Sequence, residues 1–143
     1  NTSFTANKAS IVAGNYLTLK GKIDFKEEYT ASVSNVQLIV DLPETSLYVE
    51  NSAMTGSNIA SYILDNNRLT ILLHNYTELV RFCVIPTASG EYIPNAFVQF
   101  TLNGKEILQP IGAATCTIKD LLIQVVFYTK CLQMIITIHL CPT

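Results

Sequence analysis

The sequence predicts an all-β protein built as a β-sandwich with Greek-key connections. Short runs of alternating apolar and polar residues, rich in Val, Ile, Thr, Tyr and Phe, fill most of the chain. Turn signals separate these runs roughly every 8 to 14 residues, the spacing expected of a sandwich. No stretch of the first 120 residues shows the 3.6-residue apolar period of a helix.

The alternating runs predict about seven to nine strands. The first, NYLTLKGKIDF at 15–25, is interrupted at Gly21, where we expect a β-bulge. Residues 1–10 are polar, and we expect them to form a loose start. The further predicted strands are SVSNVQLIVD, SLYVENSAM, ASYIL, RLTILL, TELVRFCVI, AFVQFTL, KEIL and AATCTI.

Turn chemistry fixes the connections between several of these runs. Asp65-Asn66-Asn67 and Asn103-Gly104 each separate two β-prone runs, and both predict hairpins because Asn and Gly tolerate positive φ. Pro43 and Pro86 end strands because proline cannot donate to a ladder. At Pro43 the chain is expected to turn over the rim of the sandwich, with Asp41 and Glu44 solvated.

The alternation also predicts which side chains fill the space between the sheets. Apolar residues at every second position of three runs, together with two from the hairpin strand RLTILL, are expected to share one core. They are Val36, Leu38, Val40, Leu69, Ile71, Val80, Phe82, Val84, Val98 and Phe100.

Charge excludes one large class of partner. The net charge is −2, charged residues make up 14% of the chain, and no basic block is present. Binding to nucleic acid needs clustered Lys and Arg, so no nucleic-acid partner is expected.

The four cysteines, Cys83, Cys116, Cys131 and Cys141, form no C-x-x-C motif. The two histidines, His74 and His139, lie far apart in the sequence, so we expect no zinc site and no cofactor. Cys83 and Cys116 are interpreted as small, buried or half-buried thiols in strands. The three full disulfide pairings stay open.

No residue pattern predicts catalysis, and we expect no catalytic, cofactor-binding or metal-binding residues. Glu27 and Glu28 are adjacent carboxylates in a polar connection, without a histidine or an apolar pocket to tune them. His74 follows a strand and is interpreted as a surface residue. No nucleophile elbow, phosphate loop or dinucleotide motif is present.

Three further kinds of site were considered, an isopeptide bond, a calcium site and a glycosylation site, and each has a simpler structural explanation. An isopeptide bond between Lys20 or Lys22 and Asn95 lacks an evident buried acid. The oxygen-rich LDNN at 64–67 is better explained as a turn than as a calcium site. The sequon that begins at Asn75 is too short a motif to carry weight.

Longer stretches resemble a known family. VSNVQLIVDLPETSLYVENSAM, YILDNNRLTILL and VRFCVIPTASGEYIPNAFVQF resemble the repeated β-sandwich module of bacterial cell-surface and S-layer-like proteins, a conserved repeat domain of unknown function. The resemblance covers about residues 15 to 120. It implies an immunoglobulin-like sandwich that serves as a spacer, stalk or adhesive unit, and it implies no catalytic residues. Glu44 stands where the family usually has Gly.

Residues 121–143 differ from the rest of the chain. They contain no acidic residue, one lysine and two of the cysteines. A transmembrane anchor is disfavoured because Lys130 would lie near the bilayer centre, at a cost of roughly 2.5 to 3.5 kcal/mol. A non-native C-terminus is the second reading. The third is added β-structure, since Val126, Tyr128, Leu132, Met134, Ile136 and Ile138 alternate, and we expect this tail to add strands to a sandwich edge, within the molecule or across a homodimer.

Together these patterns predict a domain at 1–120 and an apolar tail at 121–143. The expected function is that of a non-catalytic structural or adhesive module of a bacterial surface protein, outside the cell, in contact with neighbouring domains of that protein. The alternative is a module that binds a carbohydrate or a host protein. Trp is absent, and the tyrosines of residues 1–120 are scattered, which argues against a carbohydrate platform; they are Tyr16, Tyr29, Tyr48, Tyr62, Tyr76 and Tyr92. The chain starts at Asn1, so we interpret it as a processed product or a piece of a longer protein.

Overall fold

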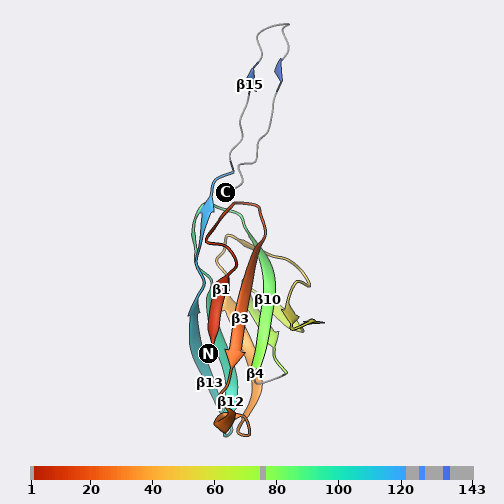
Figure 1. Ribbon diagram of the computed structural model, residues 1–143, viewed down its shortest axis with the longest axis vertical. Coiled ribbons are helices and arrows are strands. Elements are labelled where there is room, and N and C mark those ends of the chain that lie inside the picture. Colours follow the sequence, from red (N-terminus) through yellow and green to blue (C-terminus); the bar gives the residue numbers. More distant parts are fainter. Residues whose placement is uncertain (1, 75–76, 122–125, 128–133, 136–143) are drawn as a thin grey trace.

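The computed structural model describes residues 2–74, 77–121, 126–127 and 134–135. Two antiparallel sheets pack face to face, and their strands run along the long axis of the molecule (Figure 1). This is the all-β, immunoglobulin-like sandwich that the sequence predicts. Strands distant in sequence are neighbours in both sheets, as Greek-key connections require.

One layer of the sandwich is a six-stranded sheet centred on two long strands, β3 and β10. They pair over eight positions, from Leu17↔Val84 to Asp24↔Thr77. Beyond β10 the sheet continues through short strands, which end at β7. Its members are β1 (Ser3–Ala6), β3 (Leu17–Asp24), β5 (Ser46–Tyr48), β6 (Met54–Thr55), β7 (Asn58–Ile59) and β10 (Thr77–Pro86).

The other layer is a five-stranded sheet in the order β13-β12-β4-β9-β8. Its central strand ends at Asp41, before Leu42-Pro43, and the chain then crosses to the six-stranded sheet as β5. The predicted rim turn at Pro43 is confirmed. The strands are β4 (Val33–Asp41), β8 (Tyr62–Asp65), β9 (Arg68–Leu72), β12 (Asn95–Leu102) and β13 (Lys105–Ala113).

Two smaller sheets complete the described residues. β2 (Ser10–Val12), β11 (Gly90–Tyr92) and β14 (Cys116–Lys119) form a three-stranded sheet, in which β14 and β2 are parallel. In the tail, β15 (Val126–Phe127) pairs with β16 (Met134–Ile135). Neither tail strand pairs with a sandwich strand, so the expected addition to an edge of the same molecule is not observed there. Most of the tail lies outside the described residues.

Both predicted hairpins are present. Asn66 and Asn67 have φ of 48° and 64° in the turn between β8 and β9. Asn103 and Gly104 have φ of 51° and 78° between β12 and β13, as a type I′ turn requires. Turn chemistry alone therefore located two sheet connections correctly.

The predicted core is confirmed, with one difference of degree. Nine of the ten predicted side chains are at most 5% exposed, and Phe100 is half-buried at the rim of the core. Phe100 packs edge-on against Phe25, with ring centroids 5.0 Å apart. The core also recruits residues beyond the predicted set, among them Leu17, Leu19, Ile23, Phe4 and Ile118.

The expected bulge at Gly21 is wrong. β3 keeps an unbroken register through Gly21 with both β1 and β10. The reason for a glycine is instead a close approach, because an added Cβ would lie 3.2 Å from Leu38 Cδ2 of the facing sheet. The bulges fall elsewhere, in the pairing of β12 with β4 and with β13.

The expectation of a loose N-terminus is also wrong. β1 pairs with β3, and Phe4 is 6% exposed in the core. Alternation over so few residues gives a weak signal, and only the partner strand stabilises them. Between β3 and β4, the charged connection contains a 3₁₀ turn, η1 (Glu27–Tyr29).

A buried polar contact joins the small sheet to the sandwich. The hydroxyl of Tyr92 on β11 lies 2.5 Å from Ser46 Oγ on β5, and Tyr92 is 2% exposed. Desolvation in this site raises the pKa of Tyr92 to about 12. Ionised Tyr92 is therefore disfavoured in the folded protein.

The core predicts the effect of truncating its largest central side chain. Replacing Phe82 by Ala is expected to lower the free energy of unfolding by about 3 to 5 kcal/mol, because the side chain is fully buried and leaves a cavity. Urea unfolding measures this loss. Leu47→Ala, at a side chain that is 57% exposed, is the control and should change stability by less than about 0.5 kcal/mol. A loss at Phe82 under about 1 kcal/mol would contradict the assigned core.

Tyr92 predicts how stability depends on alkaline pH. Its pKa is raised from 10.0 to about 12 on folding, so its stabilising contribution is complete below pH 10 and is lost as the pH rises towards 12. Between pH 9 and pH 11.5 the unfolding free energy should fall by about 1 to 2 kcal/mol more in the wild type than in Tyr92→Phe. Equal pH slopes in both proteins would show that Tyr92 titrates normally.

Candidate functional site

The carboxylates and the histidine noted in the sequence do not meet. Glu27 and Glu28 are exposed in η1, at one end of the sandwich. His74 is exposed too, and its backbone N–H donates to the Glu78 carboxylate at 2.6 Å. Glu78 is 8% exposed on β10 and was not singled out in the sequence, although it interrupts an apolar run. No cluster of His, Cys, Asp or Glu able to hold a metal occurs among the described residues.

The two described cysteines occupy strands, as predicted. Cys116 on β14 is buried, and Cys83 on β10 is half-buried, with both thiols free. Burial raises the pKa of the Cys116 thiol, which disfavours the reactive thiolate. Cys131, Cys141 and His139 lie outside the described residues.

The residues weighed for an isopeptide bond are far apart in the fold. Lys20 and Lys22 are exposed on β3 of the six-stranded sheet, whereas Asn95 is exposed on β12 of the five-stranded sheet. Glu78 faces the core opposite Ile23, so it lies on the other face of the sheet from Lys22. The geometry offers no support for this bond.

The remaining candidates have structural roles. Residues 64–67 belong to the β8–β9 hairpin, as expected. Tyr16 and Tyr29 are exposed at opposite ends of β3, Tyr48 and Tyr62 pack against each other, and Tyr92 is buried. These described tyrosines form no exposed row, and Tyr76 with its sequon lies outside the described residues.

On the outer face of the five-stranded sheet, one row of register neighbours is apolar on four strands and has a threonine on β9. Register places the outward-facing residues of neighbouring strands opposite one another. Ile39, in the central strand, is 5% exposed but does not belong to the inter-sheet core, so side chains on the outer face cover it. We call this set the outer apolar row, and it consists of Pro110, Phe97, Ile39, Thr70 and Ile63.

Exposed apolar side chains widen this row. Ile63 is 65% exposed. In the next register position Leu108 and Leu72 are 51% and 38% exposed, with Gln99 and Gln37 between them. A polar row with the Arg68–Asp41 ion pair, whose Nε–Oδ1 distance is 2.7 Å, borders the opposite side. An apolar surface rimmed by polar residues is typical of a contact surface for another protein.

Sequence reasoning missed the outer apolar row, although a signal was present. In VQLIVD and AFVQF, alternation assigns Leu38 and Val98 inward, and polar residues are expected at the neighbouring positions. Ile39 and Phe97 break that rule. Apolar residues on both faces of a strand indicate that both faces are in contact with something.

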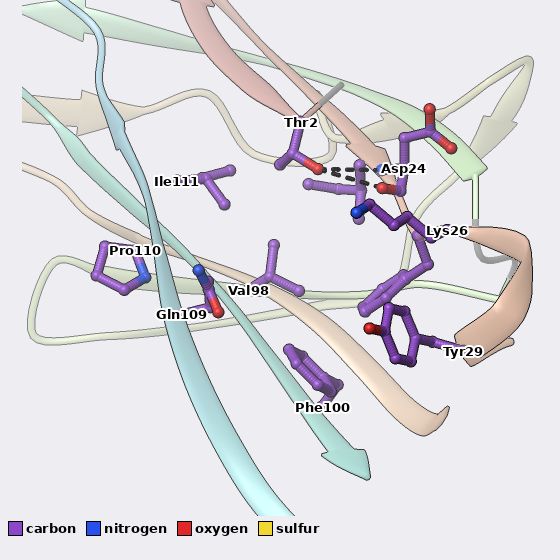
Figure 2. Close-up of a pocket in the computed structure, with 11 residues that line it drawn as sticks. Thr2, Asp24, Lys26, Tyr29, Val98, Phe100, Gln109, Pro110 and Ile111 are labelled. Atoms are coloured by element: carbon purple, nitrogen blue, oxygen red, sulfur yellow. Dashed lines mark hydrogen bonds between the residues drawn. The ribbon is translucent and has the colours of Figure 1, made fainter. Parts of the chain in front are cut away.

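A groove of about 540 Å³ opens between the two sheets at the end that holds η1. Its floor is apolar and includes Val98 and Phe100 of β12 (Figure 2). Ile23 of β3 also lines it, as does Phe25, which packs edge-on against Phe100. Ile111 of β13 closes one side. The sandwich is therefore incompletely covered at this seam.

Polar groups stand around the groove. Figure 2 shows the Lys26 ammonium and the Tyr29 hydroxyl pointing towards it from the side of η1, while the Asp24 carboxylate points away. Thr2 Oγ1 lies within 3.5 Å of the backbone oxygen of Asp24 and 3.3 Å from its nitrogen. Among the described residues that line the groove, no pair of titratable groups converges as acid–base catalysis requires.

The fold was compared with known proteins by sequence and by structure, and only the structural comparison found similar proteins. No family model matches the sequence, and neither does any curated protein. The N-terminal domain of the adhesin Sgo0707 from Streptococcus gordonii is similar in structure, with a TM-score of 0.65, 11% identity, and coverage of 82% of this chain and 32% of that one. Domains D2 and D3 of the major pilin SpaD from Corynebacterium diphtheriae are also similar in structure, with a TM-score of 0.59 and 13% identity. The match covers 80% of this chain and 51% of that one.

A third similar structure is the collagen-binding subdomain of the Enterococcus faecalis surface protein ACE, with a TM-score of 0.52, 8% identity, and coverage of 81% of this chain and 95% of that one. The chain thus spans about a third of the adhesin domain and half of the pilin fragment. These likenesses establish the immunoglobulin-like sandwich found in bacterial adhesins and pilins. The specific repeat family suggested by the sequence stays a prediction.

Proposed function

We propose that this chain is a non-catalytic adhesive or structural module of a bacterial surface protein, displayed outside the cell. The similarity of its fold to adhesin and pilin domains supports this role. The described titratable groups do not converge on a site, and they leave catalysis unsupported. No helix among the described residues is long and apolar enough to cross a membrane.

The observation that carries the proposal is the outer apolar row. A sheet that buries one face in the core normally turns a polar face to solvent, whereas this one interrupts its polar outer face with Pro110, Phe97, Ile39 and Ile63. Ile63, Leu108 and Leu72 would lose exposed apolar surface on contact with a partner. A flat face of this kind suits a polypeptide ligand better than a small molecule, which needs a concave site.

The ligand that we propose to test first is collagen, since one similar structure is a collagen-binding subdomain. As a second candidate partner, neighbouring domains of the same surface protein would contact this face if the module acts as a spacer. Carbohydrate is a weaker alternative, because the described tyrosines form no exposed row. Tandem copies beside this chain in the full-length gene would support the repeat-module role.

The matched isoleucines Ile63 and Ile59 test where the ligand binds. They are 65% and 72% exposed, but Ile63 lies on β8 of the five-stranded sheet and Ile59 on β7 of the six-stranded sheet. Ile63→Glu is expected to weaken binding to immobilised collagen by about tenfold or more, because it buries an unpaired charge in the contact. Ile59→Glu should bind as the wild type does. Surface plasmon resonance measures both.

Equal weakening by the two variants, or by neither, would place the contact elsewhere. Saturable binding to a glycan array without binding to collagen would favour the carbohydrate alternative. If the wild type binds no protein or glycan tested and tandem copies flank it, a spacer role remains the better description.

A further inference from the structure

The seam between the two sheets is closed along one half and open along the other. β1 pairs with β3 only as far as Ser3↔Lys22, and next to it β1 also lies close to β13. Beyond Lys22, β3 remains paired with β10 as far as Asp24 but no longer with β1. There the backbone of Asp24 bonds to the side chain of Thr2. The groove begins where β1 stops. Its dimensions and apolar floor suit one more extended segment.

The adjoining edge strand offers backbone partners to such a segment. β13 is the last strand of its sheet. The two-residue turn at Asn103-Gly104 makes Leu102 and Lys105 a hydrogen-bonded pair. Every second residue of β13 from Lys105 onward, namely Ile107 and Gln109, therefore also bonds its backbone to β12. The backbone groups of Glu106 and Leu108 face outward, away from β12. Pro110 occupies the next outward position, where its missing N–H breaks no bond to β12. The outward ladder therefore covers residues 106–108 and the Pro110 carbonyl.

The tail of the chain has the composition that this site needs. Even-numbered residues from 126 to 138 are apolar or aromatic except Lys130, and residues 121–143 contain no acidic residue, so an inserted segment would bury no carboxylate. The four described residues beyond 121 already have extended conformation in β15 and β16. Exposed carboxylates for Lys130 stand in η1, where Glu27 and Glu28 lie between the groove-lining residues Lys26 and Tyr29.

The described tail strands, β15 and β16, and the groove lie at opposite ends of the molecule. Figure 1 places β15 and β16 beyond the end of the sandwich where β14 leaves it, whereas η1 marks the groove end. A donor at one end and an acceptor at the other favour a contact between copies that repeats from end to end. Such a heterologous contact does not close, and it generates linear assemblies instead of a two-fold dimer.

We propose that the C-terminal tail of one copy adds a strand to the outward edge of β13 in the next copy and places its apolar side chains in the groove between the sheets. The result is an end-to-end chain of modules. The proposal uses the backbone edge of β13 and the groove, whereas the adhesive role uses outward side chains of the same sheet, and Leu108 and Pro110 border both. The proposal does not depend on adhesion.

Leu108 supplies a matched pair of variants. Leu108→Pro removes an outward N–H that makes no bond to β12, whereas Leu108→Ala keeps the N–H and shortens the same side chain. Sedimentation velocity of the full chain, in reducing buffer and over a range of concentrations, measures assembly. We expect a series of species that extends beyond the dimer, unchanged by Leu108→Ala and weakened about tenfold or more by Leu108→Pro.

Two further variants test the donor and the groove. Truncation after Asp120 should give a monomer, since it removes the donor. Ile111→Glu should weaken assembly, while Ile63→Glu, on the opposite edge of the same sheet, should not. Circular dichroism checks that each variant folds. If Ile111→Glu does not fold, the Leu108 pair decides the question.

A full chain that is monomeric at every concentration would overturn the proposal. So would a closed dimer with no larger species, or equal assembly by Leu108→Pro and Leu108→Ala. Collagen binding measured on the chain truncated after Asp120, which keeps Leu108 and the outer apolar row, reports on the adhesive role separately, so either idea can fail without the other.

Discussion

The face-to-face packing of the two sheets is the constraint on which the rest of the structure depends. Where β3 crosses β4, a methyl group at Gly21 would lie 3.2 Å from Leu38 Cδ2, so Leu38 would have to shift to accept it. Around this contact lie the fully buried Leu19, Phe82 and Val80. Removing apolar surface of this extent from water is what holds two sheets together, since a single sheet buries only half of its side chains.

That packing also explains where the molecule is open. The sheets are covered at one side by short strands and at the other by β1, which reaches only part of the length of β13. The groove lined by Phe25 and Phe100 is the stretch that β1 leaves uncovered. It is thus a consequence of the length of an edge strand, and the side chains that line it are the outermost part of the core.

The two candidate surfaces differ in origin and in the partner they suit. The outer apolar row crosses the middle of a sheet whose backbone groups are already paired, so it can offer only side-chain contact. The edge of β13 offers backbone hydrogen bonds beside a groove, which suits an extended segment. Among the described residues, neither surface brings titratable groups together, and this is why the functions proposed for both are mechanical and adhesive.

The sequence by itself determined the fold class, most of the core and two hairpins. These features depend on local rules, namely two-residue alternation and the positive φ of Asn66, Asn67, Asn103 and Gly104. Pro43 likewise ended β4 for a local reason.

Only the tertiary structure decided what depends on partners from distant parts of the chain. It recruited the short β1 into a sheet, since four residues become a strand only beside β3. It explained Gly21 by the approach of Leu38, which lies in the other sheet. It also revealed the outer apolar row and the groove, because register across five strands and the gap left by β1 are relations between strands that local alternation cannot specify.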